Sequence, residues 1–340
     1  MVVNFTKDIL ESEKQKQDIS YLIQTIAWHR HIITFDPNIA QLPHWIESKD
    51  RELLEESFVA SIIGNRPRPH CDVVTDAYAS TVTTAKIFSV REAIEYVSAP
   101  LTIILEHSNN DSLMILKMLE SYTKDAGHAY YDKRLEFGHA GGCSSIKSVI
   151  SEKIRQNGER SKMLRYFVIV DGDKRFHGQV ITKYDNLKTF LQIHNIPYHI
   201  LEKRCMENYL PCEAFPYATN KEHSKWIHAF KALTPRQRDF FNISGGLKGE
   251  LTEETKKMLK SDYSNIRTLI SLDLQHFYST VSDTNLCILT EGYTIKSFKE
   301  EFPKGFNNPS VTRESLDKIQ SHQDDPTELK QVAEQINRLL

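Results

Sequence analysis

The sequence predicts an α/β fold with a central parallel sheet flanked by helices, preceded by a mixed α/β region and followed by a mostly helical one. The apolar run Tyr166–Val170 ends in Asp171-Gly172-Asp173, and a second apolar run, Leu101–Leu105, ends in Glu106. Buried parallel strands read as continuous apolar runs, and ligands of open α/β sheets bind beyond the carboxyl ends of such strands. The sequence therefore predicts a site where these two runs end.

The segment after Leu101–Leu105 has the features of a helix start. A cluster of Ser, Asn and Asp at 108–111 precedes an amphipathic pattern of apolar residues at 113, 115, 116 and 119. Side chains of this kind cap helix N-termini, so we expect this cluster to supply the helix cap. The order is strand, acidic turn and helix, with Glu106 facing the same crevice as Asp171 and Asp173.

Asp171 and Asp173 supply hard oxygen ligands of the kind that Mg²⁺ or Mn²⁺ prefers. A solvated turn after a strand also favours Asp and Gly, and this explanation accounts for most isolated Asp-x-Asp sequences. The acid at the end of a second strand, Glu106, favours the metal site. Three carboxylates brought together without a cation raise one another's pKa values, which costs stability and is retained mainly at functional sites.

These residues resemble the Toprim domain shared by topoisomerases, primases and the overcoming-lysogenization-defect (OLD) nucleases. Members carry a Glu at the end of one strand and an Asp-x-Asp at the end of a later one, and these acids hold divalent metal for phosphodiester chemistry. The resemblance assigns the roles to Glu106, Asp171 and Asp173. It covers residues 99 to 215. Gly141 and Gly142 lie between the two strands, and we expect them to form a tight turn, with phosphate binding by their N–H groups as the less favoured alternative.

A further short strand is expected at 198–201, followed by Glu202-Lys203-Arg204-Cys205-Met206-Glu207-Asn208-Tyr209-Leu210-Pro211. This segment resembles an element of stand-alone OLD-like Toprim proteins of bacterial anti-phage defence. The resemblance implies that Glu207 joins the acidic cluster and that Lys203 or Arg204 binds the scissile phosphate. A solvated helix start with mixed charges is an equally good explanation of the segment.

The chain departs from the family pattern after Glu106. Toprim proteins usually have Gly next and another acid at the fourth position, whereas this chain has His107 and Asn110 there, with Asp111 one residue further on. Asp111 is either a shifted ligand for a second metal or a helix cap, and the cap is slightly favoured. Whether the site takes one metal or two stays open.

Composition restricts the class of protein. The chain has 340 residues, with 43 basic and 45 acidic ones and a net charge of −2, so a nucleic-acid substrate would need a local basic groove. Lys174 and Arg175 join Lys203 and Arg204 as candidates because they lie near the acids. No apolar stretch approaches the roughly 20 residues that span a bilayer and no signal peptide is recognisable, so a cytoplasmic protein without membrane contact is expected. The five cysteines are expected to be reduced thiols.

The flanking regions contain no catalytic motif. Residues 1–98 are expected to form a docking or accessory region, and 216–340 a helical region in which Thr234 and Pro235 begin a helix. In the segment Trp28–His31, packing and surface roles are favoured over metal or nucleic-acid contact. Lys304 is a minor candidate for the phosphate site.

Together these features predict a Mg²⁺- or Mn²⁺-dependent nuclease acting on DNA or RNA. The resemblance implies a role in anti-phage defence with an ABC-type ATPase, which would be a separate partner because the chain has no Gly-x-x-x-x-Gly-Lys-Ser/Thr loop. A homodimer is also compatible with the sequence. The alternatives are a catalytically inactive Toprim-like binding or regulatory subunit, and a primase-like or RNA-maturing enzyme.

Overall fold

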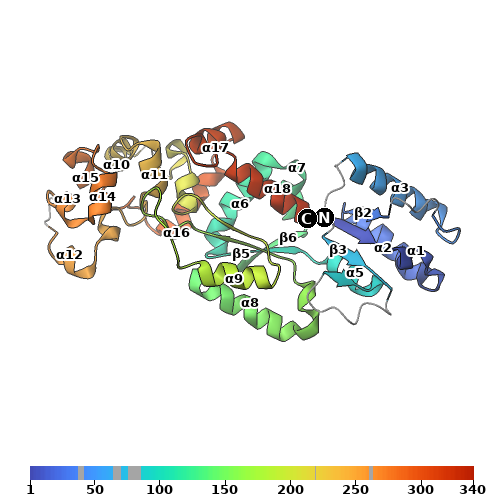
Figure 1. Ribbon diagram of the computed structural model, residues 1–340. Coiled ribbons are helices and arrows are strands. Elements are labelled where there is room, and N and C mark those ends of the chain that lie inside the picture. The colour runs from blue at the N-terminus through green and yellow to red at the C-terminus, as the bar shows by residue number, and fades with distance from the viewer. Residues whose placement is uncertain (37–41, 64–69, 76–85, 219, 260–262) are drawn as a thin grey trace.

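Two separate parallel sheets, each of four strands, form the framework of the protein (Figure 1). The computed structural model describes residues 1–36, 42–63, 70–75, 86–218, 220–259 and 263–340. The first sheet and its helices lie at one end of an elongated molecule, the second sheet lies in the middle, and the helices α10 to α15 lie at the other end. The sequence predicts one central sheet preceded by a mixed α/β region, so the separate parallel sheet that this preceding region forms is a new finding.

The first sheet has the order β2-β1-β3-β4. Its strands are β1 (Val2–Phe5), β2 (Ile32–Phe35), β3 (Cys71–Val73) and β4 (Ile87–Phe88), and its helices include α1 (Lys7–Glu11), α2 (Lys16–Trp28), α3 (Ser48–Ile63) and α5 (Val90–Ser98). The helical periodicity at Ile19, Leu22, Ile23 and Ile26 is that of α2, whose four apolar side chains are buried in the core of this sheet. The sequence of residues 80–88 also predicts a strand, of which residues 80–85 lie outside the described residues and 87–88 form β4.

The second sheet has the order β6-β5-β7-β8 and carries the acidic residues predicted above. Its strands are β5 (Leu101–Leu105), β6 (Leu135–His139), β7 (Tyr166–Val170) and β8 (Tyr198–Ile200). The apolar runs Leu101–Leu105 and Tyr166–Val170 are thus β5 and β7, which are adjacent, parallel and paired from Thr102 with Tyr166 to Ile104 with Val168.

Both faces of the second sheet are covered, which explains why its strands lack polar alternation. On one face, Ile104 and Val168 pack against the helices α8 (Cys143–Asn157) and α9 (Asp185–Ile193). On the other face, Ile103 and Phe167 belong to a larger core. That core includes residues of α6 (Ser108–Tyr122) and α7 (Lys124–Ala129).

The larger core also contains most of the C-terminal region, so the helices of 216–340 share one hydrophobic interior with the second sheet. The elements of this region are α10 (Lys221–Lys231), α11 (Pro235–Phe240), η5 (Lys248–Glu250), α12 (Glu253–Lys257), α13 (Ile266–Leu269), α14 (Leu272–Phe277), α15 (Asp283–Ile288), α16 (Phe298–Glu301), η6 (Phe302–Asn307), α17 (Arg313–Gln320) and α18 (Glu328–Leu339). The expected start of α11 is confirmed: Thr234 and Gln237 form a reciprocal capping box, with Pro235 in the first turn.

Glu328, at the start of α18, fastens this region to the strand β8. Its buried carboxylate accepts hydrogen bonds from His199 at 2.7 Å, from the backbone N–H of Glu202 at 2.7 Å, and from the hydroxyl of Tyr209. Tyr209 lies in η3 (Met206–Tyr209), the short helix that carries Glu207. The position of η3 therefore depends on α18.

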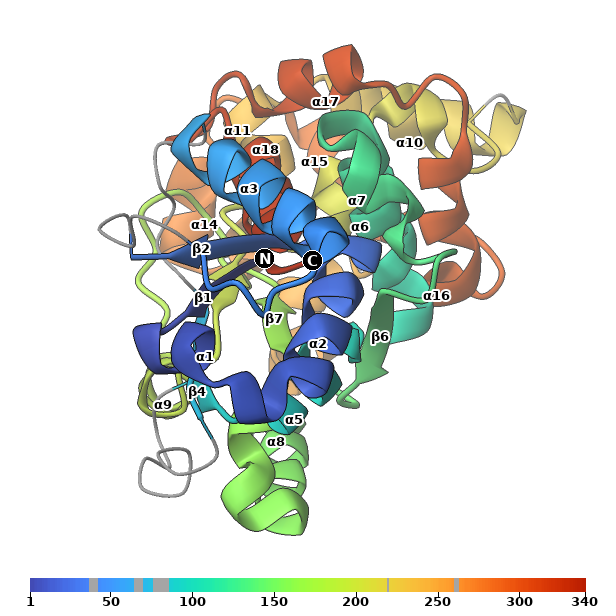
Figure 2. The ribbon, with the colours of Figure 1, turned by 90° about the vertical axis from the view of Figure 1, so that its right-hand side faces the viewer.

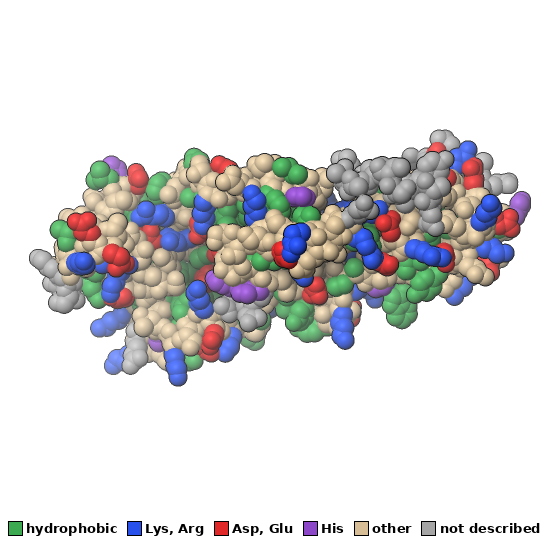
Figure 3. Space-filling view, turned by 90° about the horizontal axis from the view of Figure 1, so that it is seen from below, with side chains coloured by type: hydrophobic (Ala, Val, Ile, Leu, Met, Phe, Trp, Pro, Cys, Tyr) green, Lys and Arg blue, Asp and Glu red, His purple; other side chains and the backbone are tan. Residues whose placement is uncertain are grey.

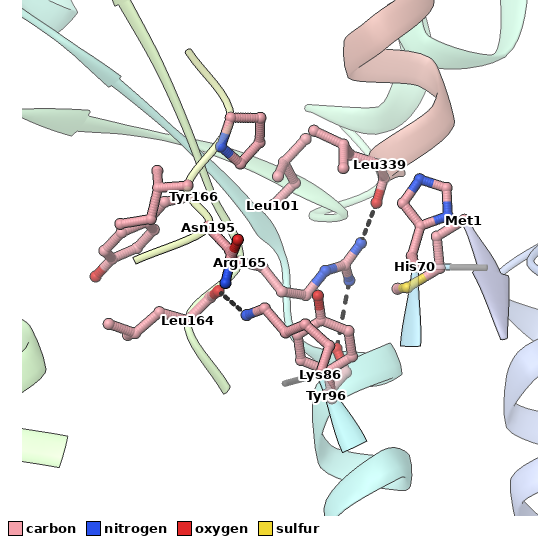
Figure 4. A pocket seen from close by; sticks show the side chains of 12 residues that line it. Met1, His70, Lys86, Tyr96, Leu101, Leu164, Arg165, Tyr166, Asn195 and Leu339 are labelled. Carbon is pink, nitrogen blue, oxygen red and sulfur yellow. Dashed lines mark hydrogen bonds between the residues drawn. The ribbon is translucent and has the colours of Figure 1, made fainter. Parts of the chain in front are cut away.

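Buried basic side chains join the two sheets. Arg165 precedes β7 and is largely buried. Its guanidinium donates to the carbonyl oxygen of Leu339 in α18 at 2.5 Å (Figure 4). It also donates to the carbonyl oxygen of Ala99 after α5. Lys86 donates to the carbonyl of Leu164 at 3.0 Å. These residues line a cavity of about 210 Å³ between the two sheets, beside Met1. The two chain ends consequently lie side by side in both views of the ribbon (Figures 1 and 2).

The charges on the surface and the state of the cysteines agree with the composition of the chain. Basic and acidic side chains are interspersed on the face in Figure 3, as the near-zero net charge suggests. All five cysteines are free thiols. Within the described ranges, no helix has the length and apolar content needed to cross a bilayer.

In the segment Trp28–His31, His31 is buried with Nε2 3.1 Å from the carbonyl oxygen of Val97, while Trp28 is exposed.

Candidate functional site

Glu106 and Asp171 follow directly after the adjacent strands β5 and β7. Because the two strands are parallel and paired in register, their carboxyl ends meet at one edge of the sheet. The structure thus brings these two predicted acids to one place. Both residues are half-buried.

Glu106 is held by the start of α8. The backbone N–H of Cys143 donates to Glu106 Oε2 at 3.1 Å, and the N–H of Gly142 donates to the carbonyl oxygen of Glu106 at 3.3 Å. A helix N-terminus favours negative charge. The other carboxylate oxygen, Oε1, is buried and has no hydrogen-bond partner of ordinary geometry among the described residues, while the backbone N–H of Asp171 lies near enough to the carboxylate to lower the pKa of Glu106. Buried acceptors are normally satisfied, so this oxygen is available for a further ligand.

The turn between β6 and α8 needs its two glycines. Gly141 has a φ of 75° and Gly142 a φ of 115°, which non-glycine residues rarely adopt. The expected role of these glycines in tight backbone geometry is confirmed. The N–H of Gly142 is used by Glu106, as described above, and not by a phosphate.

Asp171 is held from the other side of the site by η3. The backbone N–H of Met206 donates to Asp171 Oδ1 at 3.1 Å. The next residue, Gly172, passes so close to the loop after β8 that a Cβ atom there would overlap the carbonyl oxygens of Leu201 and Lys203. The central position of the Asp-Gly-Asp sequence therefore requires glycine, because there is no room for a side chain at residue 172.

Asp111 caps the start of α6 and also lies near the other acids, while its role as a metal ligand stays a prediction. It lies in the first turn of α6, and its Oδ2 accepts a hydrogen bond from the backbone N–H of His107 at 3.0 Å. This contact ties the helix start to the preceding residue, as a cap does. Its carboxylate also lies close enough to Glu106 and Glu207 for their charges to raise its pKa.

Glu207 adds a fourth acid from η3. It follows Met206, the residue whose N–H donates to Asp171, and its negative charge raises the pKa of Asp171, Glu106 and Asp111. Glu207 therefore lies near the other acids, and its role in holding a metal stays a prediction.

The mutual repulsion of these acids appears in their pKa values. Burial, followed by the charge of Glu207, raises the pKa of Asp171 well above its ordinary value. Burial, with added repulsion from Glu207 and Glu106, raises the pKa of Asp111 to about 7. Burial likewise raises the pKa of Glu106, although Lys183 and the Cys143 amide oppose the shift. We call Glu106, Asp111, Asp171 and Glu207 the acidic cluster.

Asp173 is turned toward a different set of partners. It has a left-handed φ of 53°, and its Oδ2 accepts hydrogen bonds from the Lys183 ammonium and the Tyr184 hydroxyl. Lys183 in turn lies near enough to Glu106 to lower its pKa. Asp173 therefore neighbours the acidic cluster through Lys183, whereas the sequence analysis expected it to join Glu106 and Asp171 directly.

The predicted phosphate-binding roles of Lys203 and Arg204 do not fit their positions. Lys203 has no exposure and forms a 2.8 Å ion pair with Asp239 of α11. Arg204 pairs with Glu250 of η5 at 2.6 Å. Both partners lie in the C-terminal region, so these cations hold that region against β8. Arg175 pairs with Glu250 as well, at 2.6 Å. Lys174 is half-buried next to it.

Two lysines that sequence reasoning missed lie closer to the acids. Lys183 is exposed and pairs with Asp173, and Lys299 of α16 is exposed and close enough to His107 and Asp111 to influence their pKa values. The sequence had suggested Lys304 for such a role, but Lys304 pairs with Glu301 at 2.6 Å on the surface. No local signal marks Lys299, because the packing of α16 on α6 alone brings it to the site.

The chemistry of the acidic cluster fits a hard divalent cation. It offers carboxylate oxygens, which Mg²⁺ and Mn²⁺ prefer, and one of them is the unsatisfied Glu106 Oε1. In the part of the chain that the structure describes, no three His, Cys, Asp or Glu side chains form a ready-made coordination shell. The carboxylates would therefore have to turn toward a cation in order to share it.

Comparisons with known proteins do not assign this chain to a family. Neither the protein-family models nor the curated proteins nor the solved structures gave a significant match.

Proposed function

We propose that this chain is a divalent-metal-dependent nuclease of the Toprim type that hydrolyses phosphodiester bonds in DNA or RNA. One observation carries the proposal: carboxylates from three separate chain segments gather at the ends of two adjacent parallel strands, where burial and the charges of neighbouring acids raise the pKa values of Glu106, Asp111 and Asp171. Such an arrangement costs stability without a cation and is typical of functional sites.

The acidic cluster would hold the cation. Glu106 and Asp171 are the principal ligands in this proposal, because they end the two strands, and Glu207 and Asp111 complete the set. A bound Mg²⁺ or Mn²⁺ supplies charge neutralisation at the phosphate and an activated water. Lys183 and Lys299 supply positive charge at the rim, where a substrate phosphate would enter, and Asp173 positions Lys183 through their ion pair.

The resemblance to OLD-like proteins supports a role in anti-phage defence with a separate ABC-type ATPase subunit. The chain itself contains no phosphate-binding loop of the Gly-x-x-x-x-Gly-Lys-Ser/Thr type, so nucleotide hydrolysis would come from a partner. This part of the proposal is tested by co-purification with the products of neighbouring genes that encode an ATPase.

The nuclease is tested by incubating the purified protein with Mn²⁺ or Mg²⁺ and a panel of plasmid DNA, linear DNA, tRNA and rRNA. We expect hydrolysis of at least one substrate, loss of hydrolysis in EDTA, and loss in the variants Glu106→Ala and Asp171→Asn. Asp185→Asn is the matched control, because Asp185 is an exposed acid of α9 beside the same sheet.

Folded variants that cleave as fast as the wild type would contradict the mechanism. A wild-type protein that binds Mn²⁺ but cleaves nothing in the panel would favour the alternative of an inactive binding or regulatory subunit. Synthesis of a primer, or specific trimming of a precursor RNA, would instead favour the primase-like or RNA-maturing alternative.

A further inference from the structure

A second cavity lies among the C-terminal helices, apart from the acidic cluster. It has a volume of about 610 Å³ and lies between α10, α11, α17 and the η3–η4 segment, where η4 is Cys212–Ala214. Cavities of roughly 300–1,000 Å³ are typical of small-molecule sites. The basic and acidic side chains that line it are Lys231, Arg238, Lys318, His322, Glu213 and Asp239.

The two acids of this cavity are already neutralised by neighbouring cations. Glu213 accepts from Lys231 at 2.8 Å. Asp239 accepts from the buried Lys203 at 2.8 Å through Oδ1 and contacts His322 at 2.7 Å through Oδ2. Neither carboxylate therefore has a free charge with which to repel an anionic ligand.

Two cations remain without an acidic partner among the described residues. Arg238 is half-buried and forms a single contact, at 3.3 Å, with the backbone carbonyl of Lys231. Lys318 is exposed, lines the cavity and has no ion pair within the described ranges of the chain. The Lys231 hydrogen bond lowers the pKa of Glu213, and Lys318 adds to this effect, which places its ammonium on the same side of the cavity. The cavity is thus net positive.

The remaining walls suit an organic ligand. Leu210, Phe230 and Ile243 provide apolar surface, and the Ser310 and Ser315 side chains provide hydroxyl groups. A guanidinium recognises phosphate by two parallel hydrogen bonds, and an ammonium serves as a point charge. The combination of an apolar wall with an unpaired Arg and Lys matches a ligand that has an anionic end and a flat apolar body.

We propose that this cavity binds an organic phosphate of nucleotide size, with Arg238 and Lys318 as the residues that bind its phosphate. The apolar wall receives the rest of the molecule. Lys231 and His322 lie beside the phosphate end and are held in place by Glu213 and Asp239.

The cavity wall continues directly into the acidic cluster. Asn208 lines the cavity, and its Nδ2 donates to the carbonyls of Arg238 at 2.8 Å and Phe241 at 3.0 Å. Its chain neighbour is Glu207. A ligand that shifts α11 would therefore shift η3 and the acid that it carries. This regulatory consequence rests on the proposed nuclease function, whereas the binding of the phosphate compound does not.

Binding is tested by calorimetry on the full chain in EDTA with AMP, ATP and inorganic pyrophosphate as probes. EDTA prevents a cation from attaching the probe to the acidic cluster. We expect AMP or ATP to bind, and the Arg238→Ala, Lys318→Ala double variant to bind at least about tenfold more weakly. Lys330→Ala, an exposed lysine of α18, is the control and should bind like the wild type.

The proposal is overturned if neither nucleotide binds, or if the folded double variant binds as tightly as the wild type. Pyrophosphate that binds as tightly as ATP would overturn the role of the apolar wall. Circular dichroism establishes that each variant is folded.

The link to Glu207 is tested by Mn²⁺-dependent hydrolysis with and without AMP at constant free Mn²⁺. We expect AMP to change the wild-type rate at least about twofold and to leave the double variant unaffected. Measured binding with an unchanged rate overturns the link alone. Absence of hydrolysis under all conditions contradicts the proposed function, while the calorimetry in EDTA still decides the cavity.

Discussion

Lys203 donates to Asp239 at 2.8 Å from a position in which the lysine side chain has no exposure to solvent. The same ammonium donates to the carbonyl of Ile319 at 2.9 Å, so a single cation joins the loop after β8 to α11 and α17. Burial lowers the pKa of Lys203, and the charge of Asp239 opposes this shift. The ion pair between Lys203 and Asp239 therefore holds these elements together, and its loss should destabilise the fold.

Replacing Lys203 with Met should destabilise the protein by about 3–5 kcal/mol, because Asp239 would be left as a buried charge without its main partner. Urea denaturation measures the loss, and Lys330→Met is the exposed control. If Lys203→Met were as stable as the wild type but no longer hydrolysed nucleic acid, Lys203 would have the phosphate-binding role that the sequence predicts for it.

Asp171→Asn should leave the metal-free protein at least as stable as the wild type, because it removes one charge from a crowded set of acids. Mn²⁺ should raise the thermal unfolding midpoint of the wild type and of Asp185→Asn but not that of Asp171→Asn. Differential scanning calorimetry with and without Mn²⁺ checks this. Equal stabilisation of all three proteins would show that the cation binds elsewhere.

Gly172→Ala should destabilise the protein by about 1–3 kcal/mol or more, because the added methyl group would overlap the carbonyl oxygens of Leu201 and Lys203. Gly178→Ala is an informative control. Gly178 has a φ of 83° with no atom within 4 Å of an added Cβ, so only backbone strain of about 1–2 kcal/mol is expected there. Denaturation curves for the two variants compare the costs, and a smaller loss at Gly172 than at Gly178 would contradict the close approach.

Lys299→Gln should lower the rate of Mn²⁺-dependent hydrolysis by up to about 100-fold without unfolding the protein, because the exposed ammonium lies beside the acidic cluster but supports no buried contact. Lys304→Gln is the matched control on the next element and should retain activity. If Lys304→Gln lost activity while Lys299→Gln kept it, Lys304 and not Lys299 would be the lysine that acts at the phosphate.

Acid should destabilise the first sheet through His31. Burial, with added repulsion from the positive charges of the Met1 amino group and Arg165, lowers the pKa of His31 from 6.5 to about 2. Between these values the unfolded chain binds a proton that the folded chain does not, so stability is full above about pH 6.5 and falls as the pH drops. His31→Asn should reduce this slope, measured by denaturation between about pH 7 and 4; identical slopes would exclude His31 as the cause.

The parts of the fold that follow from local sequence were predictable. The strands β5 and β7 are uninterrupted apolar runs, and the acids Glu106 and Asp171 stand directly after them, so their meeting at one edge follows from parallel pairing alone. The glycines at 141 and 142 were likewise predictable, because few other residues tolerate a positive φ.

Positions that depend on distant contacts were not predictable in the same way. Lys203 and Arg204 lie in the same segment as the candidate ligand Glu207, but the partners that fix them, Asp239 and Glu250, belong to a region with no recognisable link to that segment. The first sheet escaped recognition because its strands β3 and β4 are only three and two residues long. Neither gives a periodic signal.

The contacts of Glu328 determine which fragments of the chain can fold on their own. Since its carboxylate is the shared acceptor for His199, the Glu202 amide and Tyr209, a fragment that stops near residue 215 would lose this acceptor and expose apolar surface that α18 now covers. Residues 99–215 expressed alone should be prone to aggregation, even though every acid of the cluster is present. Fragments intended for biochemical work need residues 328–339 as much as they need the strands.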